Sequence, residues 1–239
     1  MIGGRANHLR RVAAIATVAA VIGVSAAMAF GAGPDSRSSV FSPDRGKFKI
    51  MVNGVQAGEE SFDVSRDGNN WVAHGSTEIQ SSKGVTHVTG KLVLHPDGTP
   101  ARYEWSTQGA NKAAAVVTFS GPTATIDLHV VGKRPYKQQF TFASPNIAIL
   151  DNNLYDQFGI LARLYDWQKK GEQTFPVLIP QELTPGSVTL DSLGEQESGG
   201  KKMDELQVKT ADLEVDLFLD GKKLMRIVSP SANAEIDRE

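Results

Sequence analysis

The chain of 239 residues contains no cysteine. This absence excludes a disulfide framework and a zinc site built on thiolates. It also excludes a lipid attached to a cysteine behind an N-terminal leader. A chain of this length can still bury a core large enough to fold without cross-links.

The sequence also lacks a surplus of positive charge. Lys and Arg together number 25, Asp and Glu number 27, and the formal net charge is −2. Three of the arginines lie in the first eleven residues, so the rest of the chain is more acidic still. Nucleic-acid binding normally needs a basic surface, and we therefore predict none.

Metal-binding patterns are missing too. Beyond the N-terminal segment there are four histidines, His74, His87, His95 and His129. His87 and His95 would share one face of a straight strand, but two ligands are too few, and no H-E-x-x-H sequence occurs. We predict neither a metal nor another cofactor, and we interpret these histidines as polar residues on a solvated face.

No pattern of a nucleophilic enzyme occurs in a suitable setting. Asp127 and His129 point the same way from one strand, but no G-x-S-x-G turn supplies a serine. Ser198 and Lys201 have the S-x-x-K spacing, yet they flank two glycines in a loop. We predict that the protein is not an enzyme. A hydrolase whose residues meet only in the folded chain stays an alternative.

Residues 1–29 have the three parts of a secretory signal. Arg5, Arg10 and Arg11 precede the apolar run Val12–Ala27, which ends in an Ala-Met-Ala cleavage sequence. This order predicts a signal peptide and an exported protein, periplasmic or extracellular. The alternative is an uncleaved N-terminal anchor, which is the only membrane contact that we expect.

The rest of the chain predicts a flexible linker over residues 30–45 and one β-rich domain over residues 46–239. Apolar and polar residues alternate with a period of two, as in Phe48 and Ile50 or in Ala124 and Ile126, and turn residues separate these stretches. Alternation of this kind is typical of an antiparallel sheet. We predict a mainly β fold, a large curved antiparallel sheet or incomplete β-barrel of about twelve strands.

One segment has helical periodicity. Leu154, Phe158, Leu161 and Tyr165 form one apolar stripe, and a second stripe lies beside it. The polar residues 151–153 suit an N-cap, and Gly171 suits a stop. We predict an amphipathic helix at about 153–169, buried by its broad apolar face on the concave side of the sheet.

Aromatic residues on these strands and on this helix suggest a ligand. Core packing is the usual role of such residues, but a curved sheet that half-closes around a helix can leave an apolar cavity. We predict a bound lipid or other apolar small molecule. The candidate cavity-lining residues are Trp71, Tyr103, Trp105, Phe140, Phe142, Phe158, Tyr165 and Trp167.

Two stretches, Ile149–Tyr155 and Val177–Pro180, resemble an uncharacterised family of bacterial exported proteins. In element order, over roughly residues 46–230, the chain is similar to half-barrel carriers of the lipoprotein-localisation type. It departs from them in having one clear helix, whereas such carriers generally have several. The resemblance implies an envelope protein that carries an apolar ligand. The alternative is an assembly module that binds an envelope protein through an exposed strand edge.

Overall fold

The computed structural model describes residues 41–82, 84–109, 112–210 and 213–239. The predicted signal sequence and most of the predicted linker lie outside these residues. The described chain forms one sheet of fifteen strands in the order β8-β7-β6-β5-β4-β3-β2-β1-β15-β14-β13-β12-β11-β10-β9. The predicted mainly β, antiparallel fold is confirmed, with three strands more than the twelve or so expected.

The N-terminal half of the sheet is a meander in which each strand pairs with the next in antiparallel fashion. Its strands are β1 (Asp44–Val52), β2 (Val55–Asp67), β3 (Asn70–Ser81), β4 (Gly84–Leu94), β5 (Pro100–Gln108), β6 (Ala113–Ser120), β7 (Thr123–Val130) and β8 (Tyr136–Thr141).

The C-terminal half returns to the start of the chain, because its last strand pairs with β1. Its strands are β9 (Ala148–Ile149), β10 (Gln173–Ile179), β11 (Thr184–Ser198), β12 (Lys201–Lys209), β13 (Glu214–Asp220), β14 (Lys223–Ser229) and β15 (Ala234–Arg238). Only the pair of β9 and β10 is parallel. Short 3-10 turns, η1 (Pro180–Glu182) and η2 (Pro230–Ala232), follow β10 and β14.

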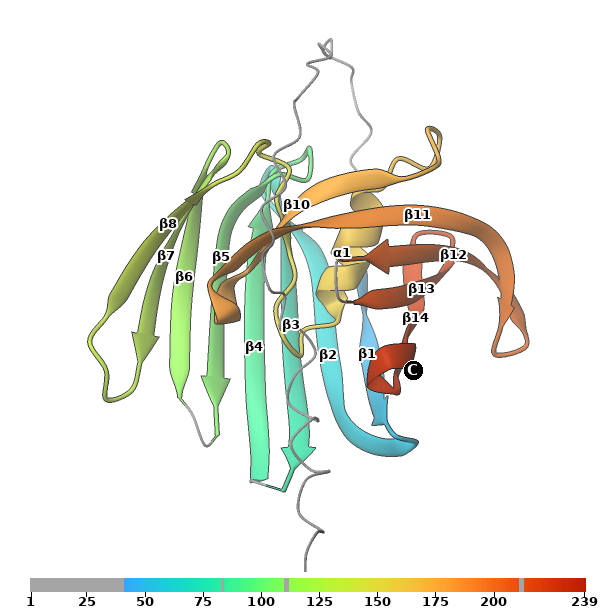
Figure 1. Ribbon diagram of the computed structural model, residues 1–239, viewed down its shortest axis with the longest axis horizontal. Helices are drawn as coiled ribbons and strands as arrows, with labels where there is room; N and C mark the ends of the chain where they lie inside the picture. Colours follow the sequence, from blue (N-terminus) through green and yellow to red (C-terminus); the bar gives the residue numbers. More distant parts are fainter. Residues whose placement is uncertain (1–40, 83, 110–111, 211–212) are drawn as a thin grey trace, which may run out of the picture.

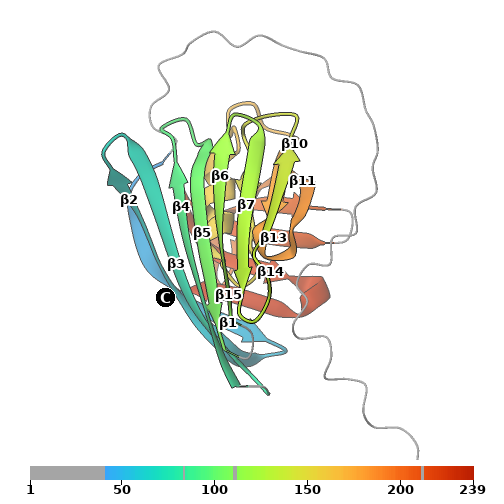
Figure 2. The ribbon, with the colours of Figure 1, turned by 90° about the vertical axis from the view of Figure 1, so that its left-hand side faces the viewer.

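The sheet is strongly bent, and its two halves face each other. In Figure 1 the strands β3 to β7 run steeply, whereas β11 to β13 run at a large angle to them. Figure 2 shows the same halves from the side, and the helix α1 (Asp156–Leu164) contributes residues to the apolar clusters of both halves. The helix therefore lies on the concave face, as the sequence predicted.

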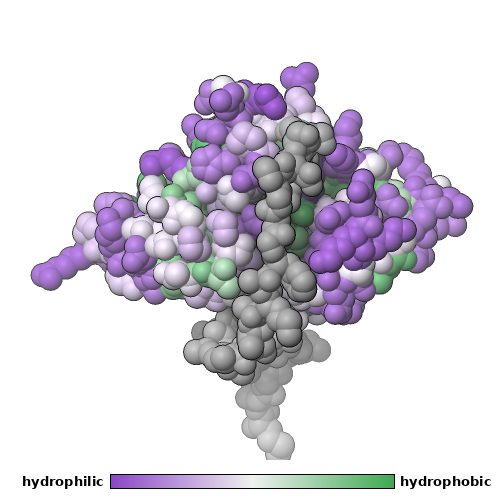
Figure 3. Space-filling view, turned by 90° about the horizontal axis from the view of Figure 1, so that it is seen from above, coloured by the Kyte–Doolittle hydropathy of each residue, from purple (hydrophilic) through white to green (hydrophobic). Residues whose placement is uncertain are grey.

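The buried apolar residues form two clusters within the bent sheet. One apolar cluster joins β1, β2 and the C-terminal strands, and a second joins β2 to β7. Helix α1 contributes Leu161 to the first cluster and Ile160 to the second. The surface seen in Figure 3 is mostly hydrophilic, with hydrophobic residues in small separate patches. No helix among the described residues is long and apolar enough to cross a bilayer.

The helix is shorter than predicted at both ends. It begins at Asp156 and not at 153, because Asn153 has a positive φ of 62° and Tyr155 occupies the N-cap position. It ends at Leu164 and not at 169, because Tyr165 is extended. The Asp166 carboxylate then accepts the backbone N–H groups of Gln168 and Lys169, which favours a turn over another helical turn.

A buried group of three charged residues fixes the helix to the centre of the sheet. The Asp44 carboxylate, at the start of β1, contacts Arg163 of α1 at 2.8 Å and Arg238 of β15 at 2.7 Å. All three side chains are less than a tenth exposed. Arg163 also donates to the carbonyl of Ser42, and Arg238 donates to that of Arg45.

We expect Asp44→Asn to lower the free energy of unfolding by about 3–5 kcal/mol, since it leaves two guanidinium groups buried without a counter-charge. Urea denaturation measures this change. Lys202→Gln is the matched control, because it breaks an ion pair with Glu195 that lies in solvent. Equal losses in the two variants would contradict the role given to Asp44.

Candidate functional site

The concave face of the sheet is covered by residues 150–165, which we call the plug segment. Leu154 of this segment packs against two strand positions that have no side chain, Gly75 on β3 and Gly90 on β4. A Cβ atom at Gly90 would lie 2.7 Å from a methyl carbon of Leu154, and one at Gly75 would lie 2.7 Å from the Asp156 carboxylate. The two glycines thus allow the plug segment to approach the strand backbone closely.

The N-terminus of α1 is capped by a residue far away in the sequence. Glu60, on β2, accepts the backbone N–H of Tyr155 at 2.8 Å and that of Asp156 at 3.2 Å. Its side chain is completely buried. No side chain next to the helix caps it, so the predicted capping by residues 151–153 is wrong. Glu60 supplies the acceptor from the opposing strand.

Asp151 has a different role from the predicted one. Its carboxylate accepts the Tyr103 hydroxyl at 2.8 Å and the Gln181 backbone N–H at 2.8 Å. Gln157 donates to the same Tyr103 oxygen and accepts the backbone N–H of Asp151. These buried bonds join the plug segment to β5 on one side and to η1 on the other.

Burial dominates the electrostatics of this polar cluster. Burial and the nearby Asp156 charge raise the pKa of Glu60 well above its usual value, and burial also raises the pKa of Asp156. Burial raises the pKa of Asp151 from 3.8 to about 7. Because two adjacent carboxylates in a dry site repel each other, this site favours a state in which Glu60 and Asp156 share a proton.

The contact between plug segment and sheet is incompletely satisfied. Two buried polar atoms on the sheet face that it covers have no hydrogen-bond partner: Thr77 Oγ1 on β3 and Trp105 Nε1 on β5. Each such atom costs about 1–3 kcal/mol when buried. The plug segment is therefore bound less tightly than an apolar segment of the same shape.

The eight predicted cavity-lining residues all lie in or against the two apolar clusters around the plug segment. Trp71, Tyr103 and Trp105 are buried in the second cluster, with Phe140 and Phe142 packed against it. Tyr165 is buried in the first cluster, with Phe158 and Trp167 against it. Tyr165 and Trp167 meet edge to face at 5.0 Å.

A hollow of about 670 Å³ lies on the opposite, outer face of β2 to β7, and we call it the outer groove. Its floor is the backbone of the row Phe62, Gly75, Gly90, Trp105 and Ala115, which strand pairing places side by side. Of the eight predicted residues, only Trp105 borders this hollow.

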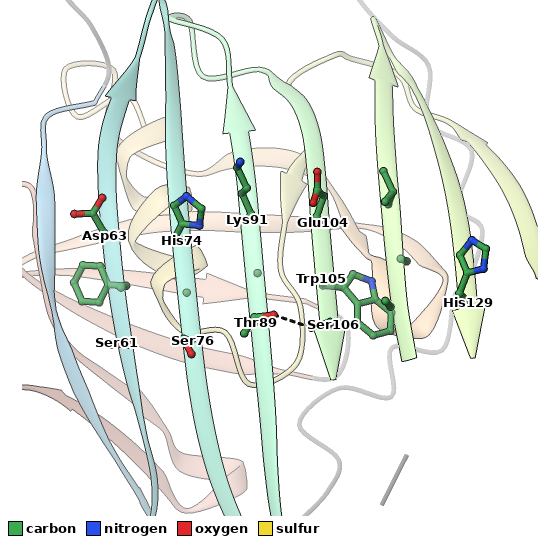
Figure 4. Close-up of a pocket in the computed structure, with 16 residues that line it drawn as sticks. Ser61, Asp63, His74, Ser76, Thr89, Lys91, Glu104, Trp105, Ser106 and His129 are labelled. Carbon is green, nitrogen blue, oxygen red and sulfur yellow. Dashed lines mark hydrogen bonds between the residues drawn. The ribbon is translucent and has the colours of Figure 1, made fainter. Parts of the chain in front are cut away.

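Two rows of side chains form the walls of the outer groove (Figure 4). The register aligns Asp63, His74, Lys91 and Glu104 in one row. It aligns Ser61, Ser76, Thr89 and Ser106 in the other row, and His129 stands at its far end. In Figure 4 α1 lies behind the strands that carry both rows.

Glu60, the partners of Asp151 and the outer groove have no local sequence pattern that marks them. One indirect signal was available: Gly75 and Gly90 interrupt otherwise regular strands, and a lone strand glycine often marks a close backbone approach. The histidines do not converge. His87 lies 3.6 Å from Glu78, and the described residues include no group of three side chains suited to a metal.

The raised pKa of Asp151 predicts a pH-dependent stability. The folded protein holds this proton up to about pH 7, whereas the unfolded chain releases it near pH 4, so the folded state loses stability as the pH rises between these values. The loss from this one group is at most about 4 kcal/mol. Glu60 and Asp156 act in the same direction.

We therefore expect the thermal unfolding midpoint to fall from about pH 5 to about pH 8, and to fall less steeply in Asp151→Asn. Differential scanning calorimetry at several pH values checks this. Asp220→Asn, in an exposed hairpin position, should follow the wild-type curve. Parallel curves for Asp151→Asn and the wild type would refute the assignment.

No protein-family model matches the sequence, and no curated protein matches it. Among solved structures, a DUF1089 family protein from Pseudomonas aeruginosa is similar over 87% of this chain and 98% of its own, with a TM-score of 0.45 and 8% sequence identity. This similarity is too low to assign a family or an activity.

Proposed function

We propose that this protein is a non-enzymatic carrier of an apolar ligand, a lipid or acyl chain, in the bacterial cell envelope. The ligand would bind on the concave face of the sheet, in the place that the plug segment now fills. Export by the predicted signal sequence and the similarity in element order to lipoprotein-localisation carriers belong to this proposal.

The incompletely satisfied contact of the plug segment is the observation that carries the proposal. Thr77 and Trp105 each leave a buried polar atom without a partner on the sheet face that the plug segment covers. A helix of nine residues is also marginal by itself, so α1 depends on its contacts with the sheet. Movement of the plug segment would expose these unpaired groups to water. Their hydration lowers the free-energy cost of that movement.

With the plug segment moved away, the concave face would be apolar enough to hold a hydrocarbon chain. Leu154, Ile160 and Leu161 now bury their side chains between the two apolar clusters. An acyl chain in their place gains about 0.8 kcal/mol for each methylene group removed from water. Such binding needs no charged contact.

A reversible lock on the plug segment tests the proposal. A Cβ atom at Gly159 of α1 would lie 3.6 Å from the Cβ of Leu224 on β14, which is within the range of disulfides. Since the chain has no cysteine, Gly159→Cys with Leu224→Cys introduces a single pair of thiols. Oxidation then ties the helix to the sheet.

We expect the reduced double variant to bind the fluorescent fatty acid cis-parinaric acid and the oxidised form to bind it at least about tenfold more weakly. Fluorescence titration measures both states of the same protein. The single variant Gly159→Cys should be insensitive to the oxidant. Equal binding in the two redox states, or no binding by the wild type, would exclude the proposal.

A further inference from the structure

The outer groove is separate from the concave face and has a different chemistry. Ser61, Ser76, Thr89 and Ser106 place one hydroxyl group on each of four neighbouring strands. Neighbouring strands are ~4.8 Å apart, so the hydroxyl groups repeat at that interval along the groove. Thr89 and Ser106 lie 2.8 Å apart and form a hydrogen bond within the row.

Charge in the opposite wall is nearly balanced. Asp63 and Glu104 are acidic, Lys91 is basic, and His74 lies between Asp63 and Lys91. This alternation gives no preference for a polyanion, which would need a run of cations. It does give alternating acceptors and donors along the groove.

Small residues keep the groove open. Gly75 and Gly90 form its floor, and serines and Ala114 make up most of one wall. The long side chains stand in the other wall, so the space between the rows is not filled from either side (Figure 4). Because it crosses six strands, β2 to β7, the groove has a length of ~20–25 Å.

We infer that the outer groove binds a neutral, linear oligosaccharide. Sugar hydroxyl groups both donate and accept hydrogen bonds, as the serine and threonine hydroxyls do, and neighbouring sugar hydroxyls can donate together to one carboxylate such as Asp63 or Glu104. The length of the groove fits several sugar units. A peptide strand would instead bind at a sheet edge, where backbone groups are free.

Isothermal titration calorimetry of the purified protein with cellohexaose, maltohexaose and N-acetylchitohexaose tests this inference, with polyphosphate as the charged comparison. We expect at least one of the three sugars to bind. Ser106→Phe should weaken that binding by at least about tenfold, because the ring occupies the groove. Glu104→Gln should weaken it by a smaller factor.

Thr118→Phe is the matched control. It places the same aromatic ring on the same outer face, on β6, at a position that does not line the groove. It should leave sugar binding within about twofold of the wild type. No binding of any of the three sugars, equal effects of Ser106→Phe and Thr118→Phe, or preferential binding of polyphosphate would overturn the inference.

Discussion

The hydrogen bonds from the backbone of Tyr155 and Asp156 to the Glu60 carboxyl group decide how the concave face is filled. They are made between residues about 95 positions apart. Without this acceptor the first backbone N–H groups of α1 would be buried and unpaired, because no neighbouring side chain caps them. The position of α1, and with it the division of the core into two clusters, follows from this contact.

The same contact adds a free-energy cost to the packing of the plug segment against the sheet. Glu60 and Asp156 bring two carboxyl groups into one dry site, where burial raises the pKa of both. A core built for stability alone would be expected to use apolar side chains here, since buried ionisable groups are commonly neutral or unfavourable for folding. The polar cluster gives a defined position to a segment that apolar packing alone would hold more tightly and less specifically.

The sequence predicts those features that depend on neighbouring residues. Alternation places Phe48, Ile50 and Ile126 on the buried face, and all three are buried. The two stripes of the helix predict its burial, and Ile160 and Leu161 do enter different clusters. Local pattern fails where a distant residue takes part. Asn153 looks like a cap, yet Glu60 does the capping, and Asp151 bonds to Tyr103, 48 positions away.

The plug segment and the outer groove are related because they share the strands β3 and β4. In a strand, alternate residues face opposite sides, so His74 and Ser76 point outward around the inward position of Gly75. The glycine required by Leu154 and Asp156 inside is therefore also the floor of the groove outside. Since only one layer of backbone separates the two sites there, a side chain introduced at Gly75 would push on the plug segment and disturb the groove floor together. The absence of a side chain at this position is thus a constraint imposed from both faces of the sheet.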